Sequence, residues 1–135
     1  FRYSIRPHGR FDSAAAHRFG TERSQPLIVV PVEAGAPAMA SLIRVAPSGV
    51  LVTALKPADD GPGPSGRRDW IVRLFGASGR PEKAVISWAD SAPITVLRSS
   101  PDEERGEQIL GPVDVPAWGM VTLRLTRDHE GQPAQ

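Results

Sequence analysis

The chain has 135 residues and a formal net charge of +1, which fits one domain, or one domain with part of a neighbour. A charge so close to zero gives no basis for binding nucleic acid or an acidic membrane, and no apolar run reaches the ~20 residues of a membrane span. The sequence has no cysteine, which excludes disulfides and thiolate chemistry. Because it opens on Phe1 within a strand-like pattern, we expect a fragment of a longer protein.

The first third of the chain predicts two strands on either side of a short helix. Residues 1–5 alternate apolar and polar side chains, and residues 27–32 form a β-branched run, so each segment predicts a strand. Between them, Asp12 or Ser13 is placed to cap a helix over residues 13–19, and Gly20 is placed to end it.

The Ala, Gly and Pro content between the two halves of the chain marks a linker and sets the expected domain boundaries. Residues 1–33 are expected to be the tail end of a preceding β-domain of a parent protein. Residues 34–40 form the linker, residues 41–127 a C-terminal β-sandwich domain, and residues 128–135 a polar, frayed tail.

Short apolar runs separated by turn residues recur after residue 41. The predicted strands are 42–45, 50–55, 70–75, 85–88, 94–97, 109–115 and 121–126, with loops at 59–68 and 99–108. The run 50–55 is apolar on both faces, which favours a central strand, whereas Gly111 and Pro112 restrict 109–115 to a sheet edge. About seven short strands predict an all-β fold: an antiparallel β-sandwich, immunoglobulin-like or a similar two-sheet arrangement, with at most one short helix near the N-terminus.

The residues show no catalytic or metal-binding pattern. The three histidines, His8, His17 and His129, have neither a nucleophile context nor a third ligand at zinc spacing. Asp59-Asp60 and the acidic run 102–104 lie in loops, where solvated turn carboxylates are the ordinary expectation. We therefore assign no catalytic residue, no metal ligand and no cofactor to this chain.

Three tryptophans are large enough to stack on a sugar ring. For Trp70 and Trp88, which lie in predicted strands, we favour core packing. Trp118 lies in a turn beside Pro116 and Gly119, so core packing and carbohydrate stacking both stay open for it.

Four segments, in order along nearly the whole chain, carry a resemblance. They are F-R-Y-S-I-R-P-H-G at 1–9, L-K-P-A-D-D-G at 55–61, I-V-R-L-F at 71–75 and T-L-R-L at 122–125. They resemble the F-x-Y-x-x-x-P-H-x-G, L-K-x-A-E-D-G, I-x-R-x-x and T-L-R-L segments of glycoside hydrolase family 38, the α-mannosidases. The first has its last spacing shortened by one, and Asp59 stands where the family usually has Glu. Trp118-Gly119-Met120 stands before the last strand, where the family usually has polar and acidic residues.

The resemblance implies a C-terminal, non-catalytic accessory domain of a zinc-dependent retaining α-mannosidase. Its zinc and its aspartate nucleophile would lie in the missing N-terminal catalytic domain, so the fragment alone is expected to be no enzyme. The implied partners are the catalytic domain of the same polypeptide and, through the full enzyme, carbohydrate. A homo-oligomer stays open, and a bacterial cytoplasmic location is weakly favoured.

Within that resemblance, Lys56, Asp59 and Asp60 are the candidates for lying near substrate, and Trp118 is the candidate for carbohydrate stacking. We favour a salt link that holds the 59–68 loop over direct substrate contact, with Lys56 and Asp60 either pairing or capping that loop. Leu55, Val72 and Leu74 are expected in the core. Two alternatives remain: an autonomous carbohydrate-binding sandwich, and a sandwich used only for protein–protein contact.

Overall fold

The computed structural model describes residues 3–25, 27–31, 33–35, 41–62, 68–88 and 94–127. These residues form one helix and eight strands. The elements are α1 Ser13–Ser24, β1 Ile43–Ala46, β2 Val50–Pro57, β3 Trp70–Gly76, β4 Glu82–Trp88, β5 Ile94–Ser99, β6 Arg105–Gln108, β7 Val113–Val115 and β8 Met120–Arg127. Residues 36–40 of the expected linker and the expected tail 128–135 lie outside the described residues.

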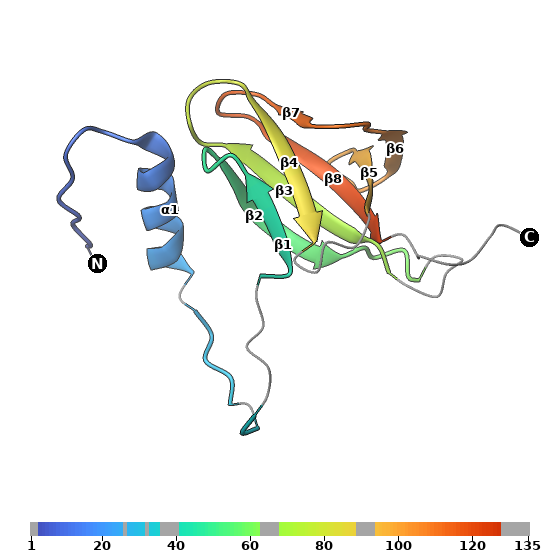
Figure 1. Cartoon of the computed structure of the whole chain (residues 1–135), viewed down its shortest axis with the longest axis horizontal. Helices are drawn as coiled ribbons and strands as arrows, with labels where there is room; N and C mark the ends of the chain where they lie inside the picture. The colour runs from blue at the N-terminus through green and yellow to red at the C-terminus, as the bar shows by residue number, and fades with distance from the viewer. Residues whose placement is uncertain are drawn as a thin grey trace, which may run out of the picture.

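The strands form two antiparallel sheets that pack as a sandwich, with α1 beside them (Figure 1). One sheet has three strands in the order β1-β4-β7, and the other has five in the order β2-β3-β8-β5-β6. The prediction of an antiparallel β-sandwich with one short N-terminal helix is confirmed. Among the described residues, no helix is long and apolar enough to cross a membrane.

The core lies between the two sheets and is centred on β3 and β8. Val72 pairs with Leu123 and Leu74 with Val121 across these strands, and all four side chains are buried. The smaller sheet contributes buried side chains from β4 and β7, namely Ala84, Val113 and Val115. Inward-facing residues alternate along each strand because successive side chains point to opposite faces. The predicted core positions of Val72 and Leu74 are thus confirmed.

The two strands predicted before the linker are wrong over the residues that the structure describes. Residues 3–8 and 27–31 have no strand partner, and Leu27 is 96% exposed. A strand is stable only when its backbone pairs with a neighbour, and the described strands of this chain pair with one another instead. Phe1 and Val32 lie outside the described residues.

Helix α1 begins as predicted but ends later. The Asp12 side chain accepts a hydrogen bond from the Ala15 N–H at 3.0 Å, which satisfies one free amide of the first turn. The prediction that Gly20 ends the helix is wrong, because α1 continues to Ser24 and the Gln25 N–H donates to the Thr21 carbonyl. Glycine in a helix interior costs some stability but does not by itself break the helix.

Three expectations about the sandwich strands also need correction. Strand β2 is an edge strand rather than a central one, and Leu55 is consequently 36% exposed rather than buried. The expected loop 99–108 contains β6, whose four residues are all exposed and which pairs with β5 at the other sheet edge. Apolar composition and charge alone did not distinguish an edge strand from a central strand or from a loop. The prediction that 109–115 lies at a sheet edge is confirmed by β7.

Two glycines should respond to alanine in opposite directions. A Cβ at Gly76 would collide with the backbone carbonyl oxygen of Pro116, whereas nothing lies within 4 Å of a Cβ at Gly20. We expect Gly76→Ala to destabilise the fold by about 1–3 kcal/mol and Gly20→Ala to stabilise it by up to about 1 kcal/mol. Urea unfolding of the two variants measures the difference, and equal effects at both sites would contradict this packing.

Candidate functional site

The segment 55–61, which carries the most specific part of the resemblance, is a turn at the end of β2. Ala58 is buried, and its N–H donates to the Asp69 carbonyl at 2.8 Å. Gly61 has φ +81°, a conformation that glycine adopts without steric cost. The turn brings three charged side chains, those of Lys56, Asp59 and Asp60, to one end of the larger sheet.

Lys56 pairs with two carboxylates. Its Nζ lies 2.7 Å from Asp59 Oδ2 and 3.0 Å from Glu103 Oε2, and these hydrogen bonds raise the pKa of Lys56. The other carboxylate oxygen of Glu103 accepts from Arg73 at 3.3 Å. The expected pairing of Lys56 with Asp60 is wrong, but the favoured salt link exists with Asp59 as the partner.

Asp60 instead pairs with Arg124 of β8. The Arg124 Nη2 donates to both Asp60 carboxylate oxygens, at 2.7 and 2.6 Å, and its Nε donates to Asp69 Oδ2 at 2.6 Å. The Arg124 side chain is 4% exposed and that of Asp69 is 6% exposed, so this is a buried ion pair. Arg105 and Thr126 also donate to Asp69, at 2.8 and 3.0 Å. Every oxygen of the Asp69 carboxylate therefore has a partner.

Sequence reasoning missed Asp69, Glu103, Arg105 and Arg124. Thr122, Arg124 and Thr126 occupy alternate positions of β8, which predicts a solvent-facing polar row. In the structure the Cα partner of Arg124 on β3 is Ile71, which is fully buried, so this face is covered. The cover comes from the turn after β2 and from the loop before β6, through Asp60 and the Glu103 carbonyl. The sequence did carry a signal for this network: Arg124 lies between Leu123 and Leu125 in a predicted strand.

An open polar hollow of about 400 Å³ lies over this network. Its charged lining residues are Asp59, Asp60, Asp102, Glu103, Glu104, Arg105 and Arg124. Hydrogen bonding to Arg124 lowers the pKa of Asp60, and hydrogen bonding to Ser100 lowers the pKa of Asp102. A general acid needs a raised carboxyl pKa, so neither group fits that role. Within the described ranges, no group of three His, Asp or Glu residues is arranged to hold a metal ion.

The lowered pKa of Asp60 gives a pH-dependent prediction. Above the ordinary Asp pKa of about 3.9, Asp60 is charged in both the folded and the unfolded chain, so its ion pair stabilises the fold there. That contribution is lost as the pH falls through the lowered pKa of the folded chain. We expect Asp60→Asn to lower Tm near neutral pH, and the difference from wild type to shrink below about pH 3.9. Thermal unfolding across pH measures this, and a difference that is independent of pH would contradict it.

Trp118, the second sequence candidate, lies in the turn between β7 and β8. It has φ +55°, which is unusual for a residue with a side chain and costs roughly 1–3 kcal/mol. Trp118 is 54% exposed, and the centroid of its indole lies 6.4 Å from that of the Phe75 ring and 5.7 Å from that of the His17 ring of α1. An open groove of about 480 Å³ runs between this indole and α1.

The other two tryptophans belong to the interior. Trp88 is buried, and its ring lies edge-on to Trp70 with centroids 6.2 Å apart. Trp70 is half-buried and packs against the core. Core packing, as predicted for both residues, is confirmed.

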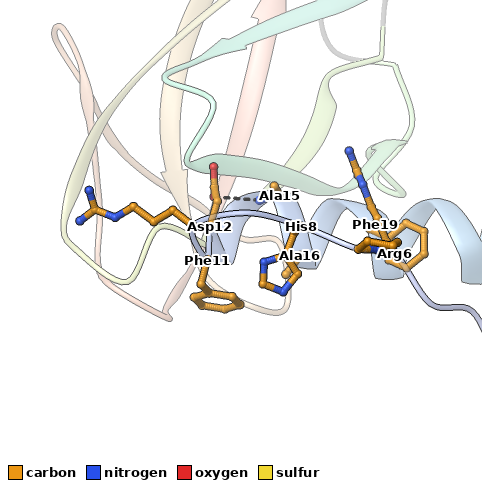
Figure 2. Close-up of a pocket in the computed structure, with 9 residues that line it drawn as sticks. Arg6, His8, Phe11, Asp12, Ala15, Ala16 and Phe19 are labelled. Atoms are coloured by element: carbon orange, nitrogen blue, oxygen red, sulfur yellow. Dashed lines mark hydrogen bonds between the residues drawn. The ribbon is translucent and has the colours of Figure 1, made fainter.

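A third hollow, of about 310 Å³, lies between the N-terminal segment and α1 (Figure 2). The Arg6 guanidinium carbon lies 5.7 Å from the Phe19 ring centroid, and the His8 and Phe11 rings are 6.0 Å apart. Figure 2 shows the Asp12 carboxylate bonded to the Ala15 amide at the start of the helix. That carboxylate already occupies the helix N-terminus, which argues against an anion site there.

No family model, no curated protein and no solved structure matches this chain. Its function therefore has to follow from its own residues and geometry.

Proposed function

We propose that this chain is the non-catalytic C-terminal β-sandwich of a family 38 α-mannosidase, and that it packs against the catalytic domain of the same polypeptide. The four sequence segments that resemble the family support this assignment. Three of them fall on elements that position the ion-pair network: the turn after β2, strand β3 and strand β8. Carbohydrate would be bound and hydrolysed by the full enzyme.

The observation that carries the proposal is the exposure of the apolar segment 27–31. Leu27, Ile28, Val29 and Val30 are all exposed, and Tyr3 and Ile5 of the preceding segment are exposed as well. Figure 1 shows both segments beside the sandwich rather than within it. Contiguous exposed apolar side chains mark a surface that another folded unit covers. The same segments have strand-forming sequences, which suits pairing with strands of a preceding domain.

The 55–61 turn supports an accessory role rather than a catalytic one. Lys56, Asp59 and Asp60 are each held by an ion pair within the sandwich, to Glu103, Lys56 and Arg124 respectively. A nucleophile or an acid–base pair in a glycosidase must instead face the substrate with its carboxylates about 5–10 Å apart. The described residues also do not fit a zinc site, so the zinc of such an enzyme would belong to the catalytic domain.

Activity of the longer natural polypeptide tests the proposal. We expect the polypeptide that contains this chain to hydrolyse p-nitrophenyl α-mannoside and to lose that activity with a zinc chelator. The 135-residue chain alone should show no turnover, with or without added zinc. A folded longer polypeptide that hydrolyses no α-mannoside, or zinc-dependent turnover by the isolated chain, would overturn the assignment.

A further inference from the structure

The indole of Trp118 is exposed but held in place. The backbone N–H of Trp118 donates to the Gly76 carbonyl at 2.9 Å, and the Gly76 N–H donates to the Gly119 carbonyl at 3.0 Å. A Cβ at Gly79 would lie 2.8 Å from the indole, so only glycine lets the ring rest against that turn. The rings of Phe75 and His17 confine it further. A ligand that stacked on this ring would lose little side-chain entropy from the protein, which favours binding.

The groove beside this indole has no lining carboxylate, lysine or arginine among the described residues and offers hydrogen-bond acceptors. Among the described residues that line it, none is Asp, Glu, Lys or Arg. Three hydroxyl groups of α1 line it: Ser13, Thr21 and Ser24. Each donates its only hydroxyl proton to a backbone carbonyl, of Ala77, His17 and Thr21 respectively. Their oxygens keep free lone pairs, so the groove fits a ligand that brings its own O–H donors.

We propose that the groove between Trp118 and α1 binds a neutral pyranose, with the apolar face of the sugar ring on the indole and its hydroxyl groups donating to α1. A pyranose presents C–H groups on one face, which suit the electron-rich face of an indole. Its hydroxyl groups supply the donors that the α1 oxygens lack. An anionic ligand finds no Lys or Arg among the described lining residues, and a wholly apolar peptide leaves the hydroxyl oxygens without donors.

This inference goes beyond the proposed function and does not depend on it. The site lies between α1 and the β7–β8 turn and requires no mannosidase activity, so a sugar other than mannose also suffices to fill it. The ion-pair network around Arg124 shares no lining residue with this groove.

Sugar binding to the full 135-residue chain tests the inference. The probes are methyl α-mannopyranoside and methyl β-glucopyranoside, with sorbitol as an open-chain polyol that has no ring face. Saturation-transfer NMR should show saturable binding of at least one pyranoside, strongest at its ring C–H protons, and no comparable binding of sorbitol. Trp118→Ala should weaken the affinity by about tenfold or more, and Trp118→Phe should restore part of it.

Two further variants keep the result interpretable. Leu110→Ala removes a more exposed apolar side chain outside the groove and should leave binding unchanged. Gly20→Leu places a side chain in the groove without altering Trp118, and should block binding while the fold is retained, because nothing lies within 4 Å of its Cβ. The inference is overturned if neither pyranoside binds, if sorbitol binds equally well, or if Gly20→Leu and Trp118→Ala, folded by thermal unfolding, bind as wild type does.

Discussion

Leu123→Ala is expected to destabilise the sandwich by about 2–5 kcal/mol. Leu123 is fully buried at the centre of β8 and lies opposite Val72 of β3, at the middle of the contact between the two sheets. Alanine there loses the burial free energy of the leucine side chain and leaves a cavity that a rigid pair of sheets cannot fill. Urea unfolding, analysed for the midpoint and the m-value, measures the effect.

Leu55→Ala provides the matched control. Leu55 lies on the edge strand β2 and is 36% exposed, so the same chemical change should cost about 1 kcal/mol. Equal losses at Leu123 and Leu55 would mean that β2 is covered in solution, and would contradict its position at the sheet edge.

Arg124→Met is expected to cost roughly 3–5 kcal/mol, because it leaves the buried Asp69 carboxylate without its strongest partner. Arg124 Nε lies 2.6 Å from Asp69 and both side chains are almost wholly buried, whereas Arg105, the other cation paired with Asp69, is 49% exposed. Methionine retains much of the side-chain volume, so the loss measures the weakened pairing of the buried Asp69 carboxylate rather than a cavity. Denaturant unfolding of the variant at neutral pH measures it.

Lys83→Met is the control for Arg124→Met. Lys83 and Asp114 are just as close, at 2.6 Å, but both side chains are mostly exposed. A surface ion pair of this kind contributes about 1 kcal/mol or less. If Lys83→Met and Arg124→Met unfold at the same denaturant concentration, burial of the Arg124 ion pairs adds nothing to the free energy of unfolding, and the prediction is wrong.

Local sequence pattern was sufficient to predict seven of the eight described strands, all but β6, but not their positions within the sheets. Alternation and β-branching located β3 and β8 closely, because each is paired on both sides and its pattern reflects burial. The same pattern made 50–55 look central, although β2 has a neighbour on one side only. Strand order is decided by long-range pairing, which no local pattern encodes.

The apolar segment 27–31 shows a different limit. Its sequence favours a strand, but a strand also needs a neighbour to pair with, and among the described residues this segment pairs with none. The strand preference of residues 27–31 is therefore not satisfied by any pairing among the described residues. A strand-forming sequence that is exposed and unpaired is the physical basis for our proposal that a folded partner covers this segment.

The candidate site was predicted in part. The loop position of Asp59 and Asp60 and a salt link that holds the loop were predicted, because neighbouring carboxylates favour turns. The partners did not follow, because Glu103 and Arg124 lie far along the sequence from Lys56 and Asp60. The exposure of Trp118 was left open by the sequence, since it depends on how α1 packs beside the β7–β8 turn.

The central claim is that the 55–61 turn stabilises an accessory sandwich and does not take part in catalysis. Its most direct test is the kcat/KM for an α-mannoside of the longer polypeptide that we propose contains this chain, carrying Asp60→Asn and measured well below its Tm. The account predicts a lowered Tm with kcat/KM within about twofold of wild type. A kcat/KM lower by about a hundredfold or more, with Tm unchanged, would contradict the account and assign Asp60 to the active site.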